Sequence, residues 1–236
     1  MSNLNFSIGG LEVATRALTP LMQFTVNIQT VPEDRQIEAV LLAAQIQLQC
    51  PQRRYAPAEK QRLLELFGPP EQWGQTLRNR LWAHANTTVG SFCGMTKAML
   101  TVPCSYDLTI ASTKYLYALE AGEVSLLFLF SGSVFYLNTE GRLQVERISW
   151  SKEAVYRFPI KAWQDLMEAH YPNSAWVGLR RDVFNELDEY KRRHGLATWE
   201  TVIQSLLSLE DPRKLNSASS ATCPSRPAPR PEEVPA

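Results

Sequence analysis

Residues 124–136, VSLLFLFSGSVFY, are the stretch that decides the fold. Apolar residues occupy both alternating sets of positions, which is typical of a strand buried on both faces at the centre of a sheet. Gly132 interrupts the run where a turn or bulge is expected. The segment is therefore predicted to be a central strand, with partner strands on both sides of it in the sequence.

Alternation with a period of two predicts the partner strands. Phe24, Val26 and Ile28 alternate with polar residues. In residues 37–49 one face is apolar, and the other carries Gln45, Gln47 and Gln49 toward solvent. Residues 32–34 between these two strands predict a hairpin connection. Further strands are predicted around residues 87–92, 98–102, 106–119 and 143–149, which gives at least six strands.

Helical periodicity appears in two other parts of the chain. From Pro57 to Trp82, apolar residues at spacings of three and four predict a helical hairpin inserted between strands. After Pro159, helices are predicted around residues 160–167, 183–190 and 198–207, the last with Thr198 as N-cap. This order favours an α+β fold: a mostly antiparallel β-sandwich or curved sheet with an inserted helical hairpin and C-terminal helices.

A change of composition divides the chain near residue 210. Residues 1–210 are predicted to form a single β-rich α+β domain, and residues 211–236 a disordered tail rich in Pro, Ser and Ala. Six of the fifteen prolines fall between Pro212 and Pro235, and this tail lacks the apolar residues that would offset its ordering entropy. Residues 226–231 favour polyproline II, which suits either a solubilising end or a ligand for an aromatic groove.

Charge and hydropathy exclude several classes of partner. The 24 basic and 24 acidic side chains cancel, so the excess of Lys and Arg that nucleic-acid binding needs is missing. The longest apolar run, Leu126 to Phe130, is far shorter than the about 20 residues that cross a bilayer. Met1 to Leu11 has neither the basic start nor the apolar run of a secretory signal. We therefore expect a cytoplasmic protein without membrane insertion.

The sequence favours a noncatalytic role over an enzyme. The four cysteines have no short paired spacing, and the three histidines fall on three different predicted elements. No phosphate-binding loop, dinucleotide fingerprint or nucleophile elbow is present in the sequence. No metal and no cofactor are therefore expected, and no catalytic residue is assigned.

The densest polar cluster follows Pro103. Cys104, Tyr106, Asp107, Lys114 and Tyr115 lie there in a predicted β context. As an enzyme or small-ligand binder, the protein would use a pocket beside these residues. In the structural alternative, Cys104 is a buried apolar residue, and Asp107 and Lys114 form an ion pair that fixes strand geometry.

Two of the six tryptophans are candidates for recognition of a partner. Trp150 and Trp176 lie in predicted connections, where aromatic side chains are exposed and can bind a partner. The other four lie on apolar faces of predicted helices, as core residues do, and they are Trp73, Trp82, Trp163 and Trp199.

A series of positions over about residues 20–208 carries a family resemblance. These positions are Tyr55, Leu66-Phe67-Gly68, Trp73, Thr76-Leu77, Leu81-Trp82, Pro103 to Asp107, Lys114-Tyr115, Leu127 to Gly132, Trp150, Glu153, Tyr156-Arg157, Trp163, Met167, Tyr171-Pro172-Asn173 and Trp176. With them the sequence resembles a bacterial family catalogued only as a domain of unknown function. Genes of that family often lie beside those of actinobacterial-type nickel-iron hydrogenases, so the resemblance implies an accessory role in a hydrogenase system. It assigns no functional residue.

Three functional hypotheses follow. The leading one is a noncatalytic protein-interaction or accessory module, with a protein partner that the resemblance implies to be hydrogenase subunits. The second is the enzyme or small-ligand binder with a pocket near Cys104, Asp107, Lys114 and Tyr115. The third is a chaperone-like holdase, which needs an exposed apolar groove.

Overall fold

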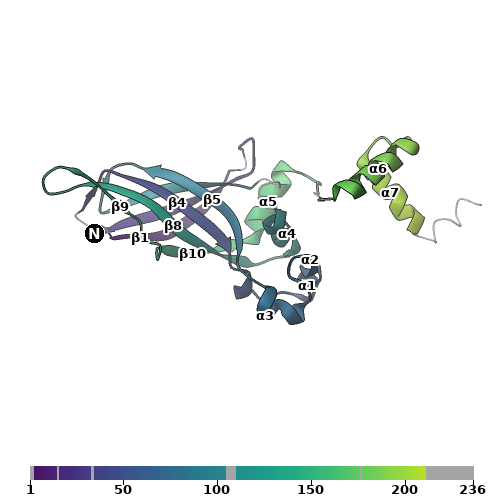
Figure 1. The fold of residues 1–236 in the computed structure, drawn as a ribbon, viewed down its shortest axis with the longest axis horizontal. Helices are drawn as coiled ribbons and strands as arrows, with labels where there is room; N and C mark the ends of the chain where they lie inside the picture. The colour runs from purple at the N-terminus through teal and green to yellow at the C-terminus, as the bar shows by residue number, and fades with distance from the viewer. Residues whose placement is uncertain (1–2, 15, 33–34, 105–109, 176, 211–236) are drawn as a thin grey trace, which may run out of the picture. The chain divides into compact units, whose positions relative to one another are not determined.

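The computed structural model describes residues 3–14, 16–32, 35–104, 110–175 and 177–210, shown in Figure 1. The chain divides into two compact units, residues 1–176 and residues 177–236. A single domain over residues 1–210 remains a prediction, and the predicted tail from residue 211 lies outside the described residues. No helix in the described ranges is both long and apolar enough to cross a membrane.

The first unit is built on antiparallel sheets. One sheet has the order β1 (Asn3–Val13), β2 (Leu21–Val31), β7 (Met95–Pro103). The second has the order β10 (Glu153–Pro159), β8 (Glu123–Leu137), β4 (Ala39–Leu48), β5 (Arg80–Val89), and β9 (Leu143–Arg147) also pairs with β8. A small third sheet joins β3 (Gln36–Ile37) to β6 (Phe92–Cys93). The predicted α+β class, with mostly antiparallel strands, is confirmed.

The core lies between the two larger sheets, which are not joined into one closed sheet. Alternate residues of β4 from Val40 to Leu48 point inward and are buried, because successive side chains of a strand point to opposite faces. Phe24 on β2 packs edge-on against Phe128 on β8 with ring centroids 5.2 Å apart. Such aromatic pairs add to the stabilisation from burial. The prediction that residues 124–136 are central is confirmed, since β8 pairs on both sides.

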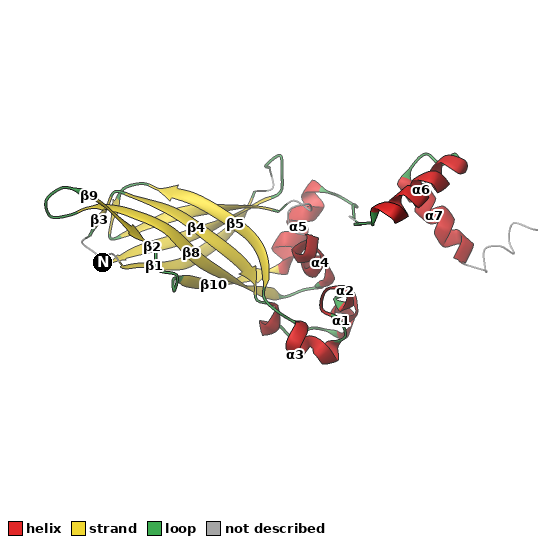
Figure 2. Ribbon diagram, in the orientation of Figure 1, coloured by secondary structure: helices red, strands yellow, loops and turns green. Residues whose placement is uncertain are grey.

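Helices gather at one end of the sheets (Figure 2). They are η1 (Cys50–Gln52), α1 (Pro57–Arg62), α2 (Leu64–Phe67), η2 (Pro70–Gln72), α3 (Trp73–Thr76), α4 (Ile110–Ala118) and α5 (Ile160–His170). Helix α5 buries Ile160, Trp163, Leu166 and Met167, as its helical spacing predicts. This end of the core is therefore closed by short helices.

Four predictions of local structure are wrong. Trp82 lies on β5 in the sandwich core, because pairing with β4 overrides the helical spacing that precedes it. Residues 110–118, which were predicted to belong to a strand, form helix α4, and Ser112, Tyr115 and Leu116 are buried at helical spacing. The strands on either side of residues 32–34, β2 and β4, are not partners of each other, because β2 pairs with β1 and β7, and β4 pairs with β5 and β8, so the predicted hairpin is wrong. Gln49, which was predicted to face solvent, is buried, and its side chain accepts a hydrogen bond from Ser125 Oγ at 2.6 Å.

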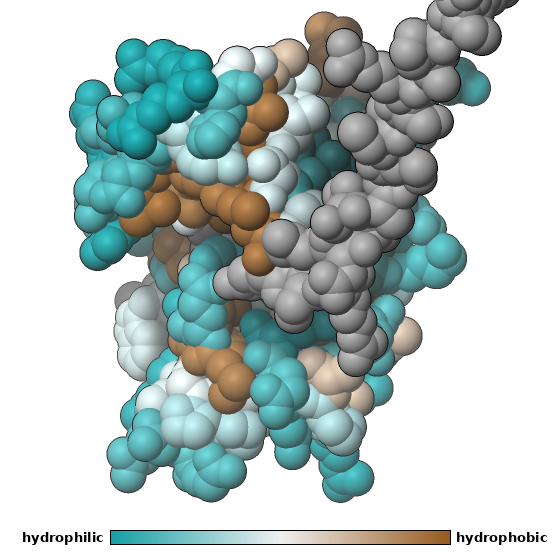
Figure 3. Space-filling view, turned by 90° about the vertical axis from the view of Figure 1, so that its right-hand side faces the viewer, coloured by the Kyte–Doolittle hydropathy of each residue, from teal (hydrophilic) through white to brown (hydrophobic). Residues whose placement is uncertain are grey.

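The second unit is a pair of helices, α6 (Arg181–Arg193) and α7 (Trp199–Glu210). The rings of Phe184 and Trp199 lie 5.2 Å apart and join the two helices. Thr198 Oγ1 accepts a hydrogen bond from the backbone N–H of Thr201, which confirms Thr198 as the N-cap. Ile203 and Leu207 on α7 are exposed. Figure 3 shows apolar surface between hydrophilic residues.

Candidate functional site

Trp150 lies in a turn between two strands that both pair with β8. Residues 147 and 153 are six positions apart, whereas the residues of β8 that pair with them, 133 and 129, are four positions apart. The turn therefore holds two more residues than the stretch of β8 that faces it. Two backbone hydrogen bonds hold the ends of the turn: Ile148 N–H donates to the Gly132 carbonyl at 3.0 Å, and Phe130 N–H donates to the Lys152 carbonyl at 2.9 Å. The Trp150 side chain is 91% exposed. The protein therefore presents a large aromatic side chain to solvent on a firmly held turn.

Gly132 allows the strands beneath this turn to approach closely. Its φ of +140° lies in a region that residues with side chains rarely adopt. A Cβ atom at this position would lie 1.9 Å from the backbone carbonyl oxygen of Leu41 on β4. Only glycine fits this close backbone contact, so the Gly132 signal in the sequence reflects a real irregularity of β8.

Exposed apolar side chains continue from the turn along β9. Leu143 and Val145 are 59% and 58% exposed. They pair with Leu137 and Phe135 of β8, whose side chains face away from the core on the same side of the sheet. Leu41 of β4 is exposed on this outer face as well. The β8–β9 hairpin extends past the sandwich at the end opposite the helices (Figure 1).

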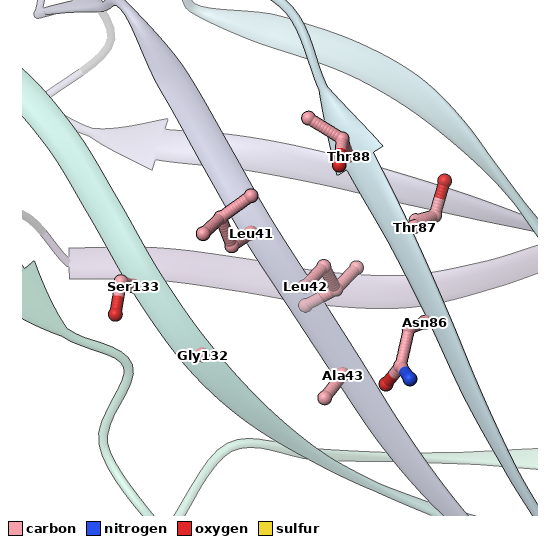
Figure 4. A pocket seen from close by; sticks show the side chains of 8 residues that line it. All are labelled: Leu41, Leu42, Ala43, Asn86, Thr87, Thr88, Gly132 and Ser133. Carbon is pink, nitrogen blue, oxygen red and sulfur yellow. The ribbon is translucent and has the colours of Figure 1, made fainter.

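A shallow hollow of about 470 Å³ lies in the second sheet, where small residues follow one another across the strands. Figure 4 shows its lining residues on three adjacent strands, β8, β4 and β5. They are Leu41, Leu42, Ala43, Asn86, Thr87, Thr88, Gly132 and Ser133. This lining contains no ionisable side chain, so the hollow offers van der Waals contact and neutral hydrogen bonds and lacks an acid or base.

The described members of the predicted polar cluster, Cys104, Lys114 and Tyr115, do not line the one hollow described above. Tyr115 is buried, and its hydroxyl hydrogen-bonds with that of Tyr55 at 2.8 Å. Lys114 forms an ion pair with Glu65, and both of these side chains are exposed. Tyr106, Asp107 and the second recognition candidate, Trp176, lie outside the described residues. The described members of the cluster therefore point to different surroundings.

Burial makes Cys104 a poor nucleophile. Removal from solvent raises the pKa of its thiol to about 12, because the thiolate loses its hydration. At neutral pH the reactive thiolate is therefore scarcely populated. Burial raises the pKa of Cys50 in the same way, to about 11. Cys104 fits the buried apolar role that the sequence offered as the alternative, and Cys50 is buried in the same way.

A buried ion pair at the helical end was not predicted from the sequence. The Arg53 and Glu59 side chains are 12% and 4% exposed, and Arg53 Nη2 lies 2.8 Å from Glu59 Oε1. Arg53 also donates to the carbonyls of Ala121 and Glu123 at 2.6 and 2.7 Å. Burial alone would raise the pKa of Glu59, but hydrogen bonds from the N–H groups of Ala56 and Glu120 and from Arg53 lower it overall. The pair ties α1 to the start of β8.

The sequence signal for this pair was weak. Glu59 lies at the third position of α1, where a glutamate often accepts the backbone N–H of the N-cap residue. That signal places Glu59 at a helix start, but its partner on the loop before the helix follows only from the fold.

Leu143 and Val145 were predicted to lie on a strand, and their exposure could not be read from the alternation.

Comparison with known protein families decides the relationship of the chain. Residues 1–215 match the family described as "Family of unknown function (DUF6084)". The chain belongs to this family. The match confirms the resemblance to a domain of unknown function, and the link to hydrogenases remains a proposal. A search of curated proteins finds no match.

Proposed function

We propose that this member of the DUF6084 family is a noncatalytic protein-interaction module that binds its partner through Trp150 and the exposed face of β9. The observation that carries the proposal is the exposure of Trp150 on a turn anchored by backbone hydrogen bonds. Tryptophan is strongly enriched among the residues that dominate binding energy at interfaces. Because the turn is already held rigidly, it loses little conformational entropy when a partner binds.

Two features favour this function over the ligand-binding alternative. The hollow in the second sheet is lined by neutral side chains, and the Cys104 thiol has a pKa raised to about 12. Exposed apolar side chains lie instead on the outer face of β9, at Leu143 and Val145, and β9 ends three residues before Trp150. Hydrogenase subunits are the first partners to test, because the family resemblance suggested them.

Photo-crosslinking in the native host tests the proposal. A benzophenone amino acid replaces Trp150 in one strain and Leu18 in another, since Leu18 is also fully exposed, at 104%. We expect one defined protein, a hydrogenase subunit in the accessory form of the proposal, to be crosslinked from position 150 and absent from position 18. Trp150→Ala should weaken binding of that protein at least tenfold, which is about 1.4 kcal/mol, and Leu18→Ala should leave it unchanged. Equal crosslinking from both positions, or none, would contradict the proposal.

A further inference from the structure

Strand β9 carries backbone hydrogen-bonding groups that point away from its only partner among the described residues, β8. The ladder fixes which residues these are. Asn138 N–H donates to the Arg142 carbonyl, and Ile148 N–H donates to that of Gly132. Hydrogen-bonded pairs alternate along an antiparallel ladder. The residues of β9 that bond to β8 are therefore 144 and 146, and the N–H and C=O groups of Leu143, Val145 and Arg147 point outward.

The other edges of the two large sheets differ from β9. Strand β1 lies beside β10, and β5 lies beside β7, so each of these edges faces a strand of the opposite sheet. In the described part of the chain, nothing pairs with the outward groups of β9. An unpaired edge of this kind is a template for another extended chain, and natural proteins usually cover or charge it.

The side chains of β9 define what such a chain would carry. Leu143 and Val145 present apolar surface on the outer face, whereas Gln144 and Glu146 alternate with them on the other face. Arg147 is exposed and has no ion-pair partner in the described residues. A matching strand would place apolar side chains beside Leu143 and Val145 and an acidic side chain beside Arg147.

We propose that β9 accepts an extended segment of the partner protein as an additional strand, with alternating apolar side chains and an acidic residue beside Arg147. This inference rests on the proposed function and names its recognition mode. Main-chain hydrogen bonds to Leu143, Val145 and Arg147 supply affinity, and the outer-face side chains supply selectivity. Trp150, three residues beyond the end of β9, then contacts the same partner next to the added strand.

A proline at position 145 separates strand addition from other binding. The N–H of Val145 points outward, so Val145→Pro removes a donor to the added strand without removing a bond to β8. Gln144→Pro is the matched contrast, because its N–H belongs to the β8 ladder and its loss should lower thermal stability. Val145→Lys is a second variant that keeps the backbone intact and puts a charge on the apolar face.

The test places the benzophenone amino acid at position 150 in chains with Val145, Val145→Pro or Val145→Lys. We expect the crosslinked partner to decrease at least tenfold in both variants, while circular dichroism shows that the sheets are retained. In the purified crosslinked complex, amide hydrogen exchange at 143, 145 and 147 should slow at least tenfold relative to the free protein.

The remaining outcomes distinguish the two proposals. Undiminished crosslinking in both variants, or unchanged exchange at the three amides, would overturn strand addition and leave the interaction at Trp150 standing. A crosslinked product made of two copies of this chain would overturn the choice of a different protein as the occupant. Failure to crosslink even with Val145 present would overturn both proposals.

Discussion

The two ends of the first unit differ in where their polar groups lie: charged side chains are buried at one end, and unpaired backbone groups are exposed at the other. At the helical end, the Glu59 side chain is buried and that of Arg53 is mostly buried, and they are met by each other and by backbone groups, with Arg53 Nε alone left without a hydrogen-bond partner in the described residues. At the β9 end, backbone groups and apolar side chains are left to solvent. Unpaired buried polar groups are costly, whereas exposed ones are satisfied by water at little cost. The comparison teaches that one end of the fold carries stability and the other can carry recognition.

The largest effect is expected at Gly132, which supports the exposed end. Gly132→Ala should lower the free energy of unfolding by about 3 kcal/mol or more, because the new Cβ overlaps the Leu41 carbonyl and φ is unfavourable. Chemical denaturation measures the change. Gly141→Ala is the control, since that glycine also has positive φ but has open space around it. Equal losses in the two variants would show that the close contact between β8 and β4 is unimportant.

A smaller but still large effect is expected at the buried ion pair. Glu59→Gln should cost about 3 kcal/mol, because it leaves the charge of Arg53 buried without its partner. Glu120→Gln is the control: its ion pair with Arg62 is about half exposed and should cost less than about 1 kcal/mol. Chemical denaturation at pH 7 compares the two variants, and similar losses of unfolding free energy would show that burial does not make the Arg53–Glu59 pair more important than an exposed pair.

The same pair makes the stability depend on pH. The pKa of Glu59 is lowered in the folded protein from its ordinary value of 4.5, so its contribution is complete above that value. It is lost as the pH falls below 4.5 and through the folded pKa. Denaturation curves between pH 7 and pH 3 should therefore converge for the native chain and Glu59→Gln. Parallel curves over this range would show that Glu59 does not titrate with folding.

The smallest effect on stability is expected at the exposed end itself. Trp150→Ala should change the free energy of unfolding by less than about 0.5 kcal/mol, because the side chain is 91% exposed. Thermal unfolding measures it, with Trp163→Ala as the contrast, which should cost about 3 kcal/mol or more for a buried tryptophan. A large loss from Trp150→Ala would mean that this residue serves the fold.

Strands with unbroken alternation could be predicted from the sequence. Residues 24–28 and 40–48 keep a single inward-facing set, and both lie in strands with that set buried. Strand β1 was missed because its register shifts between Ile8 and Gly10, so the inward set changes phase within the strand. Strand β10 was not predicted although Ala154, Tyr156 and Phe158 alternate, because the segment is short and carries the charged residues Glu153 and Arg157.

The candidate site could be predicted only in part. Trp150 was named because it lies in a connection, and its exposure supports that interpretation. The free edge of β9 could not be predicted, because which strand lies at an edge depends on pairing between distant segments. The role of Lys114 was also out of reach, since its partner Glu65 lies on a separate helix. Local alternation shows which residues face inward, and it does not show which strands are neighbours.

The turn that carries Trp150 has a consequence for how this family can vary. Because β8 binds the chain on both sides of the turn, the register of β9 and β10 does not depend on residues 149–151. The three positions can be exchanged or lengthened while the sheets stay aligned. The turn is thus a graft point, where relatives can diverge in specificity and where a peptide of choice can be inserted on an unchanged scaffold.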